Sequence, residues 1–198
     1  MDNVIEVIKR NEQLFLDNAE ALNDEEIEQE VIDGYLAIQG ATEEQLNDFE
    51  QQFQIKLPED FKAVYKYKNG TGYMSLIWPQ KDFYHGYRLL SLQEMREIKS
   101  YFQNEPHEMI EFPDIIDEKQ LQQLDERIKP YLSRERWFPF AEYANSIYLM
   151  LDYNPSPKGA AAQIICYVHD PDFIYYITPN ITEALKLTEA VIKELVYG

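Results

Sequence analysis

The stretch ATEEQLNDFEQQFQIKLPEDFKAVYKYKNGTG, residues 41–72, decides the fold because it predicts two short helices and the turns around them. Thr42 and Gln45 have the spacing of a capping box, in which each side chain satisfies a backbone N–H at the start of a helix. Leu46, Phe49 and Phe53 follow at helical spacing. We therefore expect these three side chains on one buried face.

The second half of this stretch predicts another helix. Pro58 suits the first position of a helix, where its missing N–H costs nothing, and Asn69-Gly70 offers a left-handed stop. Between them, Phe61, Val64 and Tyr65 repeat the buried spacing. No residue of the stretch is arranged for catalysis, so it is a signature of a fold.

Before this signature, residues 1–40 predict an acidic helical hairpin. Apolar residues recur near one helical face on both sides of Asn23-Asp24, first at Ile5, Ile8, Phe15, Ala19 and Leu22, then at Ile27, Val31, Tyr35 and Ile38. The sequence shows no low-complexity linker between this hairpin and the signature. We therefore expect the hairpin to pack on the domain that follows.

After the signature, the sequence predicts strands more often than helices. Residues 73–78 (YMSLIW) and 87–92 (YRLLSL) read as paired strands, and residues 146–178 as a three-stranded meander rich in β-branched and aromatic residues. Helices are expected over residues 92–102 and 117–128, with a loop over 106–113 between them, and a last helix is expected from Thr182, its candidate cap. That helix would turn Ala184, Leu185, Thr188, Ile192 and Leu195 inward. The predicted fold class is α+β: a twisted, mainly antiparallel sheet with helices packed on one face, preceded by the N-terminal acidic helical hairpin.

Composition bounds the functional classes. The 198 residues, 45% of them hydrophobic, suffice for one substantial core. No apolar run approaches the roughly 20 residues that span a bilayer, and the acidic N-terminus does not resemble a secretion signal, so a cytoplasmic location is expected. The single cysteine, Cys166, lies in the apolar run QIICYV and is expected to be buried, with a reactive thiol as the alternative.

The charge is strongly negative and unevenly distributed. The chain has 36 acidic and 18 basic residues, a net charge of −18, and residues 1–40 hold 11 of the acids and 2 of the bases. Such a field repels nucleic acid and acidic membranes and accelerates encounter with a basic partner. The alternative is that the acidic surface serves solubility alone.

The residues offer little support for catalysis. His85, His107 and His169 fall in three separate predicted loops, without a second ligand at metal spacing, and the glycines form no phosphate-binding loop. Asp152, at the end of a predicted strand, could be aimed into a cleft, although an Asx turn before Asn154 explains it as well. We therefore expect no enzyme, no metal and no cofactor.

Aromatic residues offer a binding surface instead. The chain has 15 tyrosines, and several aromatic residues cluster around the first predicted strand pair: Tyr73, Trp78, Phe83, Tyr84 and Tyr87. Tyrosine and tryptophan supply rigid contact area with a polar tip. Some of the five must be core, and Trp78 and Tyr84 are the exposed candidates because they flank the predicted turn.

Several segments, in this order, resemble the SUKH superfamily, the cell-wall-assembly-regulator-like proteins that include many bacterial immunity proteins. The matching segments are residues 41–44 (ATEE), 55–62 (IKLPEDFK), 67–70 (YKNG), 89–95 (LLSLQEM), 137–141 (WFPFA), 147–152 (IYLMLD), 163–165 (QII) and 181–185 (ITEAL). The resemblance covers about residues 41–190. It implies a domain over residues 41–198 with a helical insertion at about 101–136, preceded by the extension of residues 1–40.

The resemblance implies binding and inhibition but names no target, and it brings no catalytic residue with it. The expected partner is a cognate polymorphic toxin with a basic active-site surface, such as a nuclease, which the chain would occlude; the alternative is an intracellular regulatory scaffold. No nucleic-acid or membrane partner is expected, and the oligomeric state stays open. The candidate partner-binding residues are Glu25, Glu26, Trp78, Asp82, Tyr84, Asp114, Asp117, Glu118 and Asp152.

Overall fold

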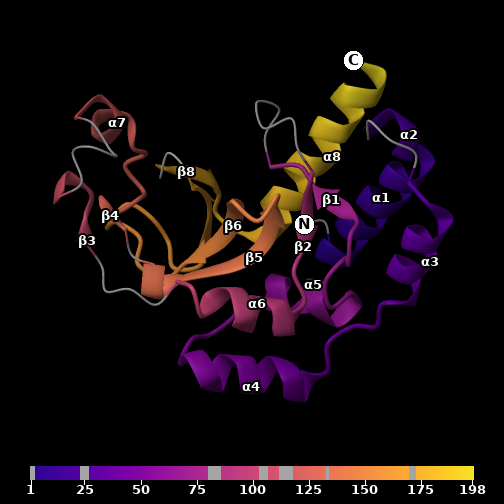
Figure 1. The fold of residues 1–198 in the computed structure, drawn as a ribbon, viewed down its shortest axis with the longest axis horizontal. Coiled ribbons are helices and arrows are strands. Elements are labelled where there is room, and N and C mark those ends of the chain that lie inside the picture. Colours follow the sequence, from indigo (N-terminus) through magenta and orange to yellow (C-terminus); the bar gives the residue numbers. More distant parts are fainter. Residues whose placement is uncertain are drawn as a thin grey trace. The chain divides into compact units, whose positions relative to one another are not determined.

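The structure, a computed structural model, describes residues 3–22, 27–79, 86–102, 107–111, 118–132, 134–169 and 173–198. The chain divides into two units (Figure 1). The first comprises Met1–Leu92 and Asn180–Gly198, and the second comprises Gln93–Pro179.

The first unit is mainly helical. Its elements are α1 (Val4–Asp17), α2 (Ala19–Leu22), α3 (Gln29–Ala37), α4 (Glu43–Phe53), α5 (Glu59–Tyr67), the antiparallel strands β1 (Ser75–Ile77) and β2 (Tyr87–Leu89), and α8 (Ile181–Tyr197). The last helix, α8, packs against α1, α2, α5 and β1, so the C-terminal helix completes a unit begun by the N-terminal residues (Figure 1).

The first signature helix, α4, begins as predicted. The Gln45 N–H donates to Thr42 Oγ1 over 3.2 Å and the Thr42 N–H to Gln45 Oε1 over 2.8 Å, which completes the capping box. Leu46 and Phe49 are fully buried, whereas Phe53 is half-buried. Gln54 then ends the helix in the left-handed conformation.

The second signature helix, α5, departs slightly from the prediction. Pro58 is its N-cap rather than its first residue, and the helix ends at Tyr67, before Asn69-Gly70. Gly70 does adopt a positive φ of 95°, but a Cβ there would lie 2.8 Å from Ser91 N. Its glycine is therefore required by a close approach of the backbone rather than by the helix end.

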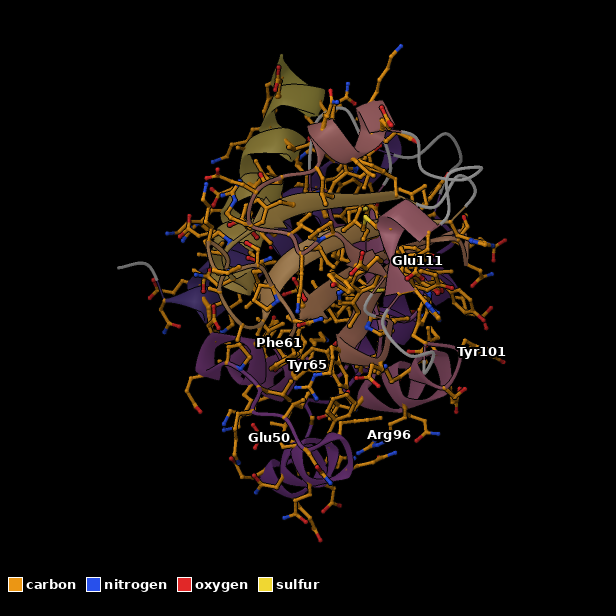
Figure 2. All side chains as sticks on the ribbon, turned by 90° about the vertical axis from the view of Figure 1, so that its left-hand side faces the viewer. Glu50, Phe61, Tyr65, Arg96, Tyr101 and Glu111 are labelled. Carbon is orange, nitrogen blue, oxygen red and sulfur yellow. The ribbon has the colours of Figure 1, made fainter. Side chains whose placement is uncertain are left out.

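Two acids of the signature hold the elements around it together. Glu50, on α4, accepts hydrogen bonds from Leu57 N at 2.7 Å and Lys56 Nζ at 3.1 Å, and in Figure 2 it lies beside the helix that carries Phe61 and Tyr65. Burial acts to raise the pKa of Glu50, but the Leu57 N–H and the two lysines nearby, Lys56 and Lys62, outweigh it and lower this pKa. Glu50 thus stays ionised while nearly buried, and it fixes the α4–α5 connection.

The second acid, Asp60, fixes the start of α8. Its Oδ2 accepts from Thr182 Oγ1 at 2.8 Å and Thr182 N at 3.3 Å. The expectation that Thr182 caps this helix is therefore wrong: Asn180 is the N-cap and accepts from Glu183 N at 2.9 Å. Ala184, Leu185, Thr188 and Ile192 point inward as predicted, but Leu195 is 41% exposed because it lies in the last turn, beyond the buried stretch.

The second unit contains a four-stranded antiparallel ladder in the order β5-β6-β7-β8. Its elements are α6 (Leu92–Lys99), β3 (His107–Glu108), the 3-10 helix η1 (Met109–Glu111), α7 (Glu118–Gln123), β4 (Tyr131–Leu132), the 3-10 helix η2 (Arg134–Arg136), β5 (Trp137–Tyr143), β6 (Ile147–Asp152), β7 (Gln163–Val168) and β8 (Phe173–Thr178). The predicted three-stranded meander, now β6 to β8, is confirmed. Cys166, paired with Leu149 on β6, is fully buried as expected.

Two parts of this unit differ from the sequence prediction. The expected loop of residues 106–113 contains β3, which pairs with β4, and Tyr131 Oη donates to Glu108 Oε1 over 2.8 Å. The helix expected over residues 117–128 stops at Gln123, so Ile128 reaches the core from a turn. The first difference arises because β3 gains order from β4, a strand distant in sequence. In the second, local turns follow the helix, since the Ile128 N–H donates to the Asp125 carbonyl and the Arg127 N–H to Asp125 Oδ1.

Each unit has its own buried cluster. Phe15, Tyr35, Met74, Leu76, Trp78, Val191 and Ile192 form that of the first unit, and Phe102, Met109, Ile128, Leu132, Trp137, Met150, Ile165, Tyr167 and Ile174 form that of the second. Helices and a mainly antiparallel set of strands place the chain in the predicted α+β class.

Candidate interaction surface

Six of the nine candidate residues lie outside the part of the chain that the structure describes: Glu25, Glu26, Asp82, Tyr84, Asp114 and Asp117. The other three are Trp78, Glu118 and Asp152. Only Glu118, the first residue of α7, is exposed.

The expectation that Trp78 is exposed is wrong. Its side chain is 2% exposed, its ring centroid lies 5.6 Å from that of Phe15 on α1, and its backbone N–H donates to Thr188 Oγ1 on α8 over 3.1 Å. Residues from both ends of the chain thus cover it, which its neighbours in sequence could not reveal. Trp78 presents no surface to a partner.

Asp152 is also a structural residue. It is 1% exposed, and its carboxylate accepts from Asn154 N at 2.8 Å, which is the Asx turn, and from Gln163 Nε2 at 3.0 Å. Burial raises the pKa of Asp152, and these hydrogen bonds oppose that rise. The carboxylate therefore closes the end of β6 and faces no cleft.

The surface that the structure does organise is acidic and lies on the first helices. Three polar contacts hold α1 against the rest of its unit. Asn11 Nδ2 donates to the Leu185 carbonyl over 2.8 Å, Tyr67 Oη donates to Glu12 Oε2 over 2.5 Å, and Arg10 Nη2 lies 3.1 Å from Glu189 Oε2. Because Asn11 is 1% exposed, its bond is shielded from water.

Lys68 fixes the end of α3 in the same unit. Its nearly buried Nζ donates to the carbonyls of Tyr35 at 3.0 Å, Leu36 at 3.2 Å and Ile38 at 3.3 Å, and it lies 4.6 Å from the centroid of the Tyr35 ring. A cation there satisfies carbonyls that a helix end leaves without an internal partner. The last turn of α3 is thereby held in place.

These contacts leave the outer faces of the helices acidic. Both bases of residues 1–40 are engaged within the unit, since Arg10 pairs with Glu189 and Lys9 lies 5.4 Å from the Tyr67 ring centroid. The exposed acids Glu6, Asp17, Glu28, Glu30 and Asp33, which we call the acidic helical surface, lie outside these two contacts. Part of the negative charge of residues 1–40 thus lies on helices that tertiary contacts hold in place.

Exposed apolar side chains accompany the acids. Leu36 is 52% exposed at the end of α3 and Tyr73 is 89% exposed before β1. Their segments meet where the Ile38 side chain approaches Gly72, at 3.6 Å from the position of an added Cβ. From the sequence, Tyr73 is only one of five clustered aromatics. Its place directly after Gly72, which has a positive φ of 58°, is the local signal that sets it apart from Trp78.

The second unit exposes Tyr101, which is 80% exposed after α6 and projects outward in Figure 2. Tyr175 on β8 is 41% exposed. Exposed acids occur in this unit too, among them Glu97, Glu111 and Glu118. We take the acidic helical surface with Leu36 and Tyr73 as the candidate for binding because Leu36 lies on the same helix as the exposed acids Glu30 and Asp33.

Within the described ranges, no three His, Cys, Asp or Glu side chains are grouped so that they could hold a metal ion. Among the same residues, none of the helices is both long and apolar enough to cross a membrane.

Comparison with known protein families identifies a match. The sequence model of the SMI1 / KNR4 family (SUKH-1) matches residues 40–187. This range agrees with the resemblance found over about residues 41–190. A search of curated proteins returns no match.

Proposed function

The chain belongs to the SMI1 / KNR4 family (SUKH-1), and from this premise we propose that it is an immunity protein: it binds a cognate protein toxin in the cytoplasm and neutralises it by covering its active site. The observation that carries the proposal is the acidic helical surface, whose scaffold is fixed by Asn11, Glu12 and Lys68.

Charge complementarity supports this function. An enzyme that cleaves nucleic acid must present basic residues to phosphates. A protein that displays carboxylates on a supported scaffold can occupy such a surface, and its field accelerates the encounter. A nuclease is accordingly the class of toxin that the charge favours.

Exposed apolar residues, once buried in the complex, would lower its dissociation rate. Interfaces are held by a few aromatic and aliphatic anchors surrounded by polar contacts. Tyr73 and Leu36 belong to the same unit as the exposed acids and already project into solvent. We assign Tyr73 the role of anchor and the acids that of steering.

The family match also favours a second candidate, a regulatory scaffold of the SMI1/KNR4 type that binds endogenous proteins. Such a protein would use the same surface without opposing a toxin. The two candidates differ in whether the chain protects a cell.

Growth rescue tests the proposal. A candidate toxin domain is expressed in a sensitive host, with the chain or with its Tyr73→Ala, Leu36→Ala variant. The parental chain should restore growth and the variant should restore it less, although both accumulate equally. Toxicity that persists beside abundant parental chain excludes that toxin, and recovery of endogenous partners alone supports the regulatory candidate.

A further inference from the structure

A groove of about 510 Å³ opens beside the N-terminal helices of the first unit. It is lined by Leu16, Asp17, Asn18, Ala19, Ala21, Ile27, Gln29 and Ile32, which belong to α1, α2, α3 and the segments at their ends. A volume of this size falls in the range of sites that hold a small ligand or a few inserted side chains.

Apolar side chains form one part of the groove. Leu16, Ala19 and Ile27 are partly buried and pack against the core cluster of the first unit that contains Phe15 and Tyr35. The apolar wall of the groove is therefore held in place by the core. Burying its partly exposed apolar surface against an aliphatic or aromatic group would lower the free energy of the complex.

The polar groups of the groove are mainly hydrogen-bond acceptors. Asn18 Nδ2 already donates to the Leu14 carbonyl over 2.8 Å, and Gln29 Nε2 donates to Asp33 Oδ1 over 2.8 Å. Both acceptors require the NH₂ group, so these bonds fix which way the two amides point. The amide oxygens of Asn18 and Gln29 receive no hydrogen bond from the described residues.

Charge adds to this acceptor character. Among the described residues that line the groove, Asp17 alone is charged, and one of its oxygens, Oδ1, accepts from Gln13 Nε2 at 2.7 Å. Asp33 carries a further exposed carboxylate on α3. A group that satisfies a carboxylate and two amide oxygens must be a donor, and a cationic donor satisfies them best.

We propose that this groove receives a basic segment of the bound protein, one Lys or Arg side chain reaching Asp17, Asn18 and Gln29 while a neighbouring apolar side chain of that segment packs on Leu16, Ala19 and Ile27. This inference rests on the proposed function for the existence of a protein partner, and it adds where that partner inserts and with what chemistry.

The first test uses the full chain and a defined probe, because the partner is unidentified. The probe is a peptide of Leu and Lys at helical spacing, and its control is the same peptide with Glu in place of Lys. On titration, the amide NMR signals of Ala19, Ala21 and Ile27 should shift with the Lys peptide and stay in place with the Glu peptide. Equal shifts with both peptides, or shifts that avoid the groove, would overturn the proposal.

A matched pair of variants separates the groove from the general negative charge. Ala21→Arg places a cation in the groove at an exposed helical position, and Ala161→Arg makes the same charge change at an exposed position of the second unit. Ala21→Arg should weaken peptide binding at least tenfold, and Ala161→Arg less than twofold. If Ala21→Arg lowers the melting temperature, Asp17→Asn replaces it, with a loss of threefold or more expected. Equal affinities of the groove variant and its control contradict the proposal.

The same variants distinguish this inference from the proposed function when the toxin domain replaces the peptide. If the parental chain and Ala21→Arg neutralise the toxin equally, the proposed role of the groove is wrong, but the proposed immunity function is unaffected. A toxin that fails to bind the parental chain, while the Lys peptide still occupies the groove, overturns the immunity function for that toxin and leaves the groove standing.

Discussion

Glu50 and Asp60 show how single side chains turn a sequence signature into tertiary structure. Glu50 accepts the Leu57 N–H across the α4–α5 connection, and Asp60 holds Thr182, which lies 122 residues further along the chain. Their neighbours in the signature, Phe61 and Tyr65, are buried and stack with ring centroids 4.7 Å apart. Glu50 and Asp60 therefore serve the fold, and neither belongs to the acidic helical surface.

The contribution of Glu50 to stability can be tested by its replacement at neutral and acid pH. Glu50→Gln should lower the free energy of unfolding by about 1–3 kcal/mol at pH 7, because it weakens a buried charge-assisted bond. The folded-state pKa of Glu50 is lowered, so its stabilisation is present above the unfolded-state value and is lost as the pH falls through the folded-state value. In urea unfolding, the difference in unfolding free energy between the parental protein and Glu50→Gln should become smaller as the pH is lowered. Asp48→Asn, at an exposed position of α4, is the control, and a gap independent of pH would contradict this assignment.

The Asp60–Thr182 contact is tested by a double-mutant cycle. Asp60→Ala and Thr182→Ala should each destabilise the protein, and the double variant should cost less than their sum, with a coupling of about 0.5–1.5 kcal/mol. Additive losses in chemical denaturation would show that the two side chains do not cooperate in starting α8.

At the scale of elements, the sequence predicted what local chemistry determines. The capping box of α4, the buried positions of α5 and the strands β6, β7 and β8 could be identified because residue spacing and residue type alone specify them. The strand β5 (Trp137–Tyr143) was not predicted, although residues 137–141 are one of the segments that resemble the family. Pro139 argues against a strand because it cannot donate to a ladder, and the structure accommodates it where the β5–β6 register shifts between Pro139 and Ala141.

The remaining differences depend on contacts distant in sequence. Thr182 and Asn180 both have capping side chains, and only the partner Asp60 decides which of them caps α8. Trp78 looked like a surface residue of a turn, but α1 and α8 bury it. For the candidate surface, the sequence predicted the sign and rough position of the charge, whereas the exposure of Tyr73 required the tertiary structure.

The attachment of α1 to α5 gives a prediction at alkaline pH. Burial, reinforced by the hydrogen bond to Glu12, raises the pKa of Tyr67 from 10.0 to about 12. Because the unfolded chain releases this proton first, the stabilisation is complete below pH 10 and is lost as the pH rises toward about 12. Tyr67→Phe should cost about 1 kcal/mol at pH 7.

The pH dependence provides the measurement. The difference in unfolding free energy between the parental protein and Tyr67→Phe should shrink between pH 10 and about 12. Tyr73→Phe, at an exposed position, is the control and should leave the unfolding free energy at pH 7 unchanged. A constant difference for Tyr67→Phe would mean that the hydroxyl group does not link α1 to α5.

At the scale of the whole molecule, the net charge of −18 matters through its distribution. The structure pairs the few bases of the N-terminal helices within their unit and leaves carboxylates outward, so a basic partner meets an attractive field before contact. The screening length shrinks from about 10 Å at 0.1 M salt to about 3 Å at 1 M. Association with the partner should therefore slow steeply as salt is raised, while dissociation changes less.

Neutralising the acidic helical surface should have the same effect as salt. Glu28→Gln, Glu30→Gln and Asp33→Asn together should reduce the association rate about tenfold at low salt. The control removes the same charge from exposed positions of the second unit by Glu97→Gln, Glu111→Gln and Glu118→Gln. Stopped-flow or surface-based kinetics compare the two, and equal rates would show that the location of the acids is irrelevant.

The most direct test of the central claim, that this chain neutralises a protein by direct binding, is an activity titration. The purified toxin domain is assayed on its own substrate while the chain is added from substoichiometric amounts to excess. Activity should fall linearly to zero at one binding equivalent, and the two proteins should elute as a stable complex. Full toxin activity in the presence of excess folded chain would contradict it.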